Sequence, residues 1–336
     1  MKWERSIFLL LLGFWIGLAG VERGEARATE LRKAIPVDST TDSTGPAQNG
    51  VPFEEPNPNR SISVAGTPGS MSSLAVYPAG APLTIASSAM MIDARSGTVL
   101  FFKNPDIQRP VASTQKLLTA LLIAEHGGLD STVRVAAEDC AVEPTKLGFR
   151  PGETYTKRQL LAAMLVHSCN DAAVCLARND AGSISAFAGL MNLKAAQLGA
   201  VNSHFVNPNG LPKPGQYSTA RDMARIAFAA YHIPTLREFM RLPGLTFTYS
   251  SGRRRFLEPT NKLVTRSTIF TGMKTGYTEA SGRCLVSSVS ASGNDIILVQ
   301  LGGTHRMLFD DAERLLQWGV ERREGGRDTN LFSNRD

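Results

Sequence analysis

The chain contains 336 residues, 43% of them hydrophobic, so it can bury a substantial core and is too apolar to be disordered throughout. The formal net charge of +6 is modest and is spread along the sequence. The basic run Arg253-Arg254-Arg255 has neither the aromatic interleaving nor the motif of a nucleic-acid-binding protein, so we interpret it as solvated loop charge and expect no nucleic-acid partner.

The first 28 residues have the organisation of a signal peptide. Lys2 and Arg5 form a charged start, the stretch from Ile7 to Leu18 is apolar, and small residues follow it. This apolar stretch is short for a membrane span, so we expect cleavage at positions 19–20 or after Ala28, with an uncleaved anchor as the alternative. Export would place the protein in the periplasm or another extracytoplasmic part of the cell envelope.

Composition divides the rest of the chain into three parts. Residues 29–82 are rich in Ser, Thr, Pro, Gly and Asn and are expected to form a flexible, disordered arm. Residues 83–322 carry the hydrophobic patterns of a folded domain. Residues 323–336 are a polar tail, so we expect no C-terminal membrane anchor.

Within residues 83–322, strand patterns stand at both ends and helical patterns in the middle. We therefore expect a mixed α/β fold: an antiparallel sheet, assembled from both chain ends and flanked by helices, with a helical subdomain beside it. A site is expected in the groove between the sheet and this subdomain. The expected strands are 89–93, 98–103, one that contains Lys274, 283–290 and 296–301, and the expected helices are 113–126, a largely helical stretch to about 231, and 309–319.

Ser113 and Lys116 begin one of the expected helices, which ends at Gly127-Gly128. Residues three apart share a helix face, so Lys116 can act as the base that a serine nucleophile needs. Pro110 lies just upstream, which places Ser113 in the first turn, where the helix dipole favours developing negative charge. Lys116 must be partly neutral to accept a proton, and burial beside a second cation such as Lys274 would promote that.

Each motif also has an ordinary structural interpretation. Ser113 can be a helix N-cap with Lys116 on the surface. Ser168-Cys169-Asn170 can be a polar turn between two helices, and Lys274-Thr275-Gly276 can be the end of a strand. Their order and context together favour an active-site serine acyltransferase that works without histidine.

These motifs resemble those of the penicillin-binding D-alanyl-D-alanine carboxypeptidases, which carry S-x-x-K, S-x-N and K-T-G. The resemblance runs from about Leu83 to about Val320 and implies a β-lactamase/transpeptidase-like fold for this penicillin-binding serine peptidase domain. Flanking segments similar to the family are Met91 to Leu100, Arg109 to Ala112, Leu147 to Glu153, Ser218 to Ala224 and Gly272 to Thr278.

The resemblance implies catalytic roles for the first two motifs. Ser113 would attack the carbonyl between the two D-alanines of a peptidoglycan stem peptide, and Lys116 would take its proton. Ser168 would relay a proton to the leaving amine, and Asn170 would hold the amide of the substrate. Water would then hydrolyse the acyl-enzyme, whereas β-lactam antibiotics would acylate Ser113 and leave slowly.

The resemblance also implies a substrate-binding strand. Lys274 and Thr275 would bind the C-terminal carboxylate of the substrate. The backbone N–H groups of Ser113 and Tyr277 would form the oxyanion hole, and Gly276 would let the substrate lie close. Family members often place an arginine where this chain has Leu308, so Arg306 is the nearest candidate for a further carboxylate contact, with a solvated loop arginine as the alternative.

The cysteines predict no metal site. Cys140, Cys169, Cys175 and Cys284 lack metal-ligand spacing, and we expect Cys169 to be a packing residue rather than a nucleophile. We expect no cofactor. The expected partners are peptidoglycan stem peptides and, as covalent inhibitors, β-lactams.

Four functions remain open from the sequence. The first is a serine-type D-Ala-D-Ala carboxypeptidase that removes the terminal D-alanine. A D,D-endopeptidase that cleaves peptidoglycan cross-links is the alternative, supported by the segment Gly282 to Val286. A serine β-lactamase is disfavoured because no glutamate stands in a deacylation motif. A noncatalytic cell-wall binding protein is disfavoured by the intact Ser113, Lys116 and Lys274.

Overall fold

The computed structural model describes residues 75–76, 78, 80–304 and 307–324. The signal peptide expected at 1–28, nearly all of the arm expected at 29–82, Arg306 and most of the polar tail lie outside the described residues. Within the described part of the chain, no helix combines the length and the apolar character needed to cross a membrane.

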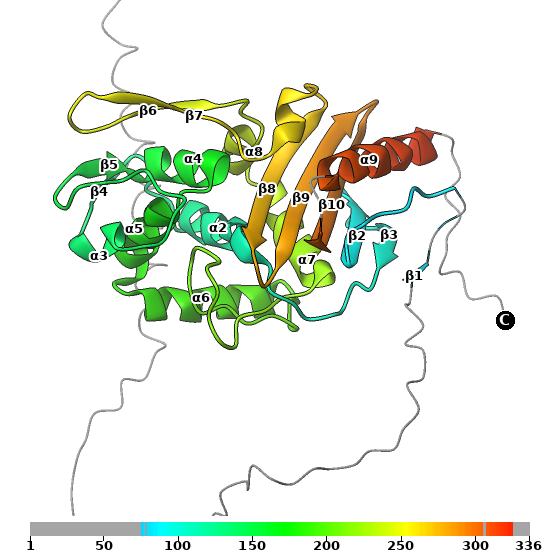
Figure 1. Ribbon diagram of the computed structural model, residues 1–336, viewed down its shortest axis with the longest axis horizontal. Coiled ribbons are helices and arrows are strands. Elements are labelled where there is room, and N and C mark those ends of the chain that lie inside the picture. Colours follow the sequence, from blue (N-terminus) through cyan, green and yellow to red (C-terminus); the bar gives the residue numbers. More distant parts are fainter. Residues whose placement is uncertain (1–74, 77, 79, 305–306, 325–336) are drawn as a thin grey trace, which may run out of the picture. The chain divides into compact units, whose positions relative to one another are not determined.

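A six-stranded sheet forms the centre of the domain, in the order β1-β3-β2-β10-β9-β8 with every neighbouring pair antiparallel (Figure 1). The N-terminal hairpin and the C-terminal strands pair through β2 and β10, as the sequence predicted. Strand β8 is an edge, so one side of it is free to face the site. The strands are β1 (Ala75–Val76), β2 (Ser88–Asp93), β3 (Val99–Lys103), β8 (Phe270–Thr278), β9 (Gly282–Ala291) and β10 (Asn294–Gly303).

The two faces of this sheet are covered by different helices, which explains the long runs of buried residues in its central strands. Helix α9 (Leu308–Glu324) covers one face, where it packs through a small apolar cluster that includes Leu315 and Leu298. Helix α9 is longer than the predicted 309–319 and runs into the segment expected as tail. The opposite face packs against a larger core that includes residues of α2 and α7 (Ala220–Tyr231).

The helical subdomain is built around α2 (Lys116–His126), whose residues from Lys116 to Ile123 are all buried. The sequence predicted this helix from Ser113, but a 3₁₀ turn, Ala112–Gln115, precedes it. Because side chains on every side of α2 are buried, it is a central helix rather than an amphipathic surface helix. The other helices of this stretch are α3 (Ala137–Cys140), α4 (Lys157–His167), α5 (Asn170–Ala181), α6 (Ile184–Gln197) and α8 (Pro234–Met240).

Two small sheets were not predicted. Strands β4 (Thr132–Arg134) and β5 (Thr154–Thr156) pair at the edge of the subdomain, and β6 (Leu245–Thr248) and β7 (Arg254–Leu257) form a hairpin. A second 3₁₀ turn, Lys262–Thr265, follows the hairpin and leads into β8. Strands of three or four residues leave too little alternation for a sequence pattern to show.

Candidate active site

Ser113 and Lys116 face each other at the start of α2, as predicted. The 3₁₀ turn carries Ser113, and Lys116 is the first residue of the α-helix. The Nζ atom of Lys116 lies 2.6 Å from the Oγ atom of Ser113. The Lys116 side chain is fully buried at 0% exposure, so its polar end must be satisfied by protein groups.

Two fixed oxygens satisfy that amine. The Nζ atom of Lys116 donates to the Oδ1 atom of Asn170 at 2.6 Å and to the backbone oxygen of Asn209 at 2.6 Å. Asn170 cannot rotate away, because its Nδ2 atom donates to the backbone oxygens of Glu143 at 2.9 Å and Pro144 at 3.0 Å. Its Oδ1 atom is therefore held toward Lys116.

This arrangement suits a neutral lysine. A neutral amine has two N–H groups and one lone pair. If the two N–H groups are donated to Asn170 and Asn209, the lone pair is directed at the hydroxyl of Ser113. That is the geometry of a general base poised on its nucleophile.

Burial and charge both favour the neutral form. Burial is the main reason that the pKa of Lys116 lies well below its ordinary value, and the neighbouring cation Lys274 lowers it further. Burial also lowers the pKa of Lys274 to about 7. The sequence predicted this pairing of Lys116 with a second cation.

The loop that supplies Asn209 was not predicted to contribute to the site. Its carbonyl accepts a hydrogen bond from Lys116 and lies 3.2 Å from the hydroxyl of Ser113, so the serine proton can point either to this carbonyl or to the Lys116 amine. The next residue, Gly210, has a φ of +84°, and a Cβ atom there would lie 2.2 Å from the backbone oxygen of Ala112. Only glycine allows this loop to approach the turn that carries Ser113 so closely. The Asn-Pro-Asn-Gly sequence signals a turn, but no local pattern shows what the turn contacts.

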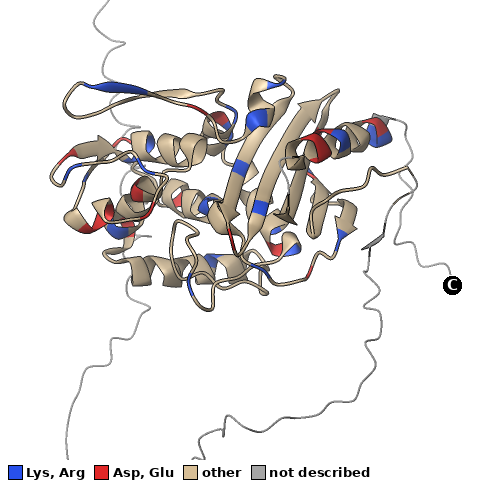
Figure 2. Cartoon of the chain, in the orientation of Figure 1, with Lys and Arg blue, Asp and Glu red and all other residues tan. Residues whose placement is uncertain are grey.

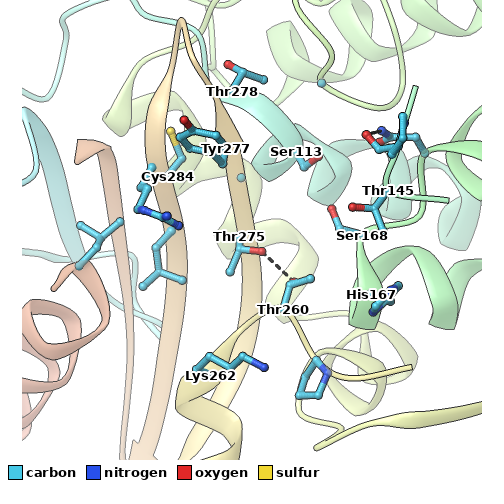
Figure 3. Close-up of a pocket in the computed structure, with 18 of the residues that line it drawn as sticks. Ser113, Thr145, His167, Ser168, Thr260, Lys262, Thr275, Tyr277, Thr278 and Cys284 are labelled. Atoms are coloured by element: carbon cyan, nitrogen blue, oxygen red, sulfur yellow. Dashed lines mark hydrogen bonds between the residues drawn. The ribbon is translucent and has the colours of Figure 1, made fainter. Parts of the chain in front are cut away.

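Ser168 stands at the end of α4, between the two halves of the site. Its φ of 66° and ψ of 27° are left-handed, an uncommon conformation for a residue other than glycine. The turn ends α4 and starts α5, and it leaves the Ser168 side chain only 9% exposed beside the cavity that Ser113 also lines. Figure 3 shows the two serines on facing segments.

Strand β8 forms the opposite wall with Thr275, Gly276 and Tyr277. The hydroxyl of Thr275 donates to that of Thr260 at 2.7 Å (Figure 3). A Cβ atom on Gly276 would lie 2.9 Å from the backbone nitrogen of Ser113. Gly276 therefore lets the strand pack directly on the turn that carries Ser113, whereas the family resemblance implied only that this glycine lets the substrate lie close.

These walls enclose a cavity of about 520 Å³ that Ser113, Ser168, Asn170, Thr275, Gly276 and Tyr277 all line. The sequence-predicted residues thus come from the helical subdomain and from the sheet, as expected. Lys116 and Lys274 are fully buried behind the cavity wall. Arg306 is not among the described residues, so its predicted contact remains a prediction.

Arg283 lines the same cavity and was missed by the sequence reasoning. In the β8–β9 register Thr275 is opposite Leu285 and Tyr277 is opposite Arg283. Arg283 is therefore the diagonal neighbour of Thr275 on one face of the sheet, within reach of a long side chain. Its guanidinium lies 5.2 Å from the centre of the Tyr277 ring, and no described carboxylate forms an ion pair with it. The sequence predicted both strands but not their register, and the register is what makes Arg283 a neighbour of Thr275.

The cysteine beside Ser168 has no features of a nucleophile. Cys169 is buried, and burial raises the pKa of its thiol to about 12, so it stays protonated at neutral pH. Cys140, Cys175 and Cys284 are also free thiols. The described residues contain no cluster of His, Cys, Asp and Glu that could hold a metal ion.

Known structures share this architecture. A D-alanyl-D-alanine carboxypeptidase from Mycobacterium tuberculosis H37Rv superimposes with a TM-score of 0.69 at 33% identity, covering 73% of this chain and 96% of that one. A mutant of the Streptomyces K15 DD-transpeptidase matches with a TM-score of 0.67 at 28% identity, covering 71% and 99%. The mixed α/β transpeptidase-like fold expected from the sequence is thus confirmed.

Sequence comparisons agree. The D-alanyl-D-alanine carboxypeptidase DacB2 of Mycobacterium tuberculosis is 34% identical over 253 residues, covering 73% of this chain and 86% of the relative. A D-alanyl-D-alanine endopeptidase of Pseudomonas aeruginosa is 34% identical over 255 residues, covering 71% and 80%. Residues 76–305 match the model of the D-alanyl-D-alanine carboxypeptidase family. The chain therefore belongs to this family of serine peptidases, as the resemblance of its motifs predicted.

Proposed function

We propose that this protein is a serine-type D-Ala-D-Ala carboxypeptidase that removes the terminal D-alanine from peptidoglycan stem peptides. The observation that carries the proposal is the fully buried Lys116 amine, 2.6 Å from the Ser113 hydroxyl and fixed by Asn170 and Asn209. Family membership supports this activity, and several relatives are named for it.

In the acylation step, the Oγ atom of Ser113 attacks the carbonyl carbon between the two D-alanines while its proton passes to Lys116. The backbone N–H groups of Ser113 and Tyr277 stabilise the negative oxygen of the tetrahedral intermediate. The C–N bond then breaks, and the departing D-alanine amine takes a proton from Lys116 by way of Ser168. A free lone pair of Asn170 Oδ1 accepts the substrate amide N–H.

In the deacylation step, water attacks the Ser113 ester and gives a proton to the base, and the ester C–O bond breaks to restore the serine. A β-lactam acylates Ser113 in the same way and leaves slowly. No cofactor enters either step, since the nucleophile, the base and the proton relay are all side chains of this chain.

Specificity for a free chain end comes from Thr275 and Arg283, which line the cavity, and from the charge of Lys274 behind its wall. The Thr275 hydroxyl, now held by Thr260, can rotate to donate to a carboxylate. Arg283 reaches the same position from β9 and supplies a fixed positive charge. We assign Arg283 the further carboxylate contact for which Arg306 was the candidate from the sequence.

Cleavage of cross-links is the second candidate, because an endopeptidase relative is as similar as the carboxypeptidase relative, both at 34% identity. Both activities use the same acyl-enzyme, and both require the protein to be outside the cytoplasm. Residues 1–28, as a signal peptide, would direct its export.

The test is to incubate the protein with a soluble D-Ala-D-Ala pentapeptide and, separately, with cross-linked peptidoglycan. The proposal expects stoichiometric release of free D-alanine from the pentapeptide and slower cleavage of cross-links. Release of cross-link fragments without free D-alanine from the pentapeptide would make endopeptidase the function.

A further inference from the structure

The β6–β7 hairpin presents one face to the protein and one to solvent. Its inward side chains, Phe247 and Leu257, are buried at 2% and 0% exposure. Its outward side chains face solvent, because register places Thr246 opposite Phe256 and Thr248 opposite Arg254, and all four are exposed. We call these four residues the outer hairpin face.

The hairpin is fixed rather than free, although two strands alone are marginally stable. At its tip, the Tyr249 hydroxyl donates to the backbone oxygen of Leu147 at 2.8 Å, and Ser250 Oγ donates to that of Thr154 at 3.0 Å. Phe247 packs against Phe149 and Tyr155, with ring centres 6.2 Å and 5.3 Å apart. The outer hairpin face is therefore presented in one orientation.

A large aromatic ring lies open on this face. Phe256 is 63% exposed. A Cβ atom on Gly244 would lie 2.2 Å from its Cζ atom, so the ring rests against glycine backbone and is held in place. An oriented, exposed ring flanked by threonine hydroxyls offers a sugar a surface for its C–H face and partners for its hydroxyl and N-acetyl groups.

The charge of this region is unbalanced. No carboxylate among the described residues forms an ion pair with Arg253 or Arg254, and the nearby Glu258 pairs with Lys262 at 3.4 Å. Arg253 instead stacks on the Tyr249 ring, 3.9 Å from its centre. Figure 2 shows the resulting basic stretch along the hairpin. It complements an anionic ligand, to which Arg254 can offer a bidentate contact.

The hairpin leads directly into the active site. Strand β7 ends at Leu257, and the next three residues, Glu258 to Thr260, line the catalytic cavity. Thr260 stands four positions after Phe256, roughly 13 Å of extended chain. An extended stem peptide of five residues spans roughly 17 Å. A stem peptide that reaches Ser113 can thus stay attached to a polymer lying on the hairpin.

We propose that the outer hairpin face, with Arg253, binds the glycan strand of peptidoglycan and the carboxylates of its stem peptides. The proposal rests on the proposed function, whose substrate is carried on this polymer. The sequence favoured solvated charge for the three arginines and offered no support for the alternative, a contact with an anionic cell-wall polymer. An anionic lipid surface would satisfy the arginines but gives no role to the oriented ring and the hydroxyls.

The experiment compares two double variants of the full chain. Arg254→Ala with Phe256→Ala removes one charge and one exposed ring from the hairpin. Arg95→Ala with Leu193→Ala removes one charge and one exposed apolar side chain elsewhere, since the Arg95 side chain is 64% exposed and Leu193 is 61% exposed. Binding is measured by co-sedimentation with peptidoglycan sacculi and with vesicles of phosphatidylglycerol and phosphatidylcholine. Soluble pentapeptide cleavage is assayed in parallel.

The hairpin variant is expected to bind sacculi about tenfold more weakly than wild type and to cleave the soluble pentapeptide at the wild-type rate. The control variant is expected to match wild type in both assays. Unchanged binding to sacculi by the hairpin variant would overturn the proposal, as would a loss confined to the anionic vesicles. If wild type releases no D-alanine from the pentapeptide, the proposed function fails, and the sacculus result still decides the hairpin proposal.

Discussion

The Nζ atom of Lys116 lies 2.6 Å from the Oγ atom of Ser113, inside a site where the lysine has no access to solvent. On the proposed mechanism, the proton that leaves the serine passes to this amine. Asn170 and Asn209 hold the amine in place, so the direction of its lone pair is set before substrate arrives. Preorganisation of this kind lowers the barrier because no group has to reorient during the reaction.

Replacing Lys116 by arginine tests whether the neutral form is the active one. The guanidinium stays protonated at all working pH values, so Lys116→Arg supplies a permanent positive charge and no base. We expect the rate of acylation by a fluorescent penicillin to fall about 10²–10⁴-fold. The measurement is the rate of adduct formation under single-turnover conditions. An arginine variant that acylates within a fewfold of wild type would rule out Lys116 as the base.

Lys274 is expected to cost stability, because a fully buried lysine has lost its hydration. Its folded-state pKa of about 7 is below its unfolded value, so the unfolded chain binds more protons between pH 7 and about 10.4 and stability rises with pH across that window. Lys274→Met, which keeps the volume, should raise the unfolding free energy at pH 7 by about 2 kcal/mol and lose penicillin acylation. Urea denaturation at several pH values measures the first effect, and adduct formation with a fluorescent penicillin measures the second.

The control for Lys274→Met is how the difference in unfolding free energy between the variant and wild type changes with pH. The gain in unfolding free energy over wild type should shrink as the pH rises from 7 toward 10, because wild-type Lys274 becomes neutral in the unfolded chain as well. A gain independent of pH would mean that packing, rather than the buried charge, is responsible.

Gly276→Ala tests the contact between β8 and the nucleophile turn. The added Cβ atom would lie 2.9 Å from the Ser113 backbone nitrogen and 3.0 Å from Ala112 Cβ, so the turn must shift. A displacement near 1 Å costs about 10²-fold in rate, whereas overpacking costs about 1–3 kcal/mol in stability. Gly189→Ala in α6 is the matched control, because its Cβ atom would meet nothing within 4 Å. Comparable acylation by both variants would show that the contact does not position Ser113.

Arg283→Ala tests the assignment of the substrate carboxylate. Losing a charged hydrogen bond should lower kcat/KM for the pentapeptide about 10–100-fold, and Arg283→Lys should restore part of it because the charge returns without the planar fork. The comparison substrate is the same peptide with a C-terminal amide. Wild type should cleave this amide slowly, and Arg283→Ala should cleave it at the same rate as wild type. An equal loss on both substrates, or a loss in Arg306→Ala instead, would contradict the assignment.

The sequence predicted the parts of the site that depend on local pattern. Ser113 and Lys116 follow from spacing on one helix, and the strand that carries Lys274 follows from strand residues near the chain end. The antiparallel sheet built from both chain ends was also predicted, because strand patterns stand at each end of the domain.

The rest of the site depends on contacts between distant segments. Asn209 reaches Ser113 across 96 residues of sequence, and the backbone oxygens of Glu143 and Pro144 that orient Asn170 carry no side-chain signal. The start of α2 differed from prediction because Ala112 adopts a φ of +48° under the Gly210 loop, so a 3₁₀ turn carries Ser113. Packing against the Gly210 loop determines this 3₁₀ turn, and the hydrophobic periodicity of the sequence does not indicate it.

The most direct test of the account is the intact mass of the protein after incubation with benzylpenicillin, followed by peptide mapping. We predict one penicilloyl adduct per chain, located on Ser113, and none on Ser113→Ala with an unchanged melting temperature. An adduct on any other residue, or an adduct that persists in Ser113→Ala, would contradict the assignment of Ser113 as the nucleophile.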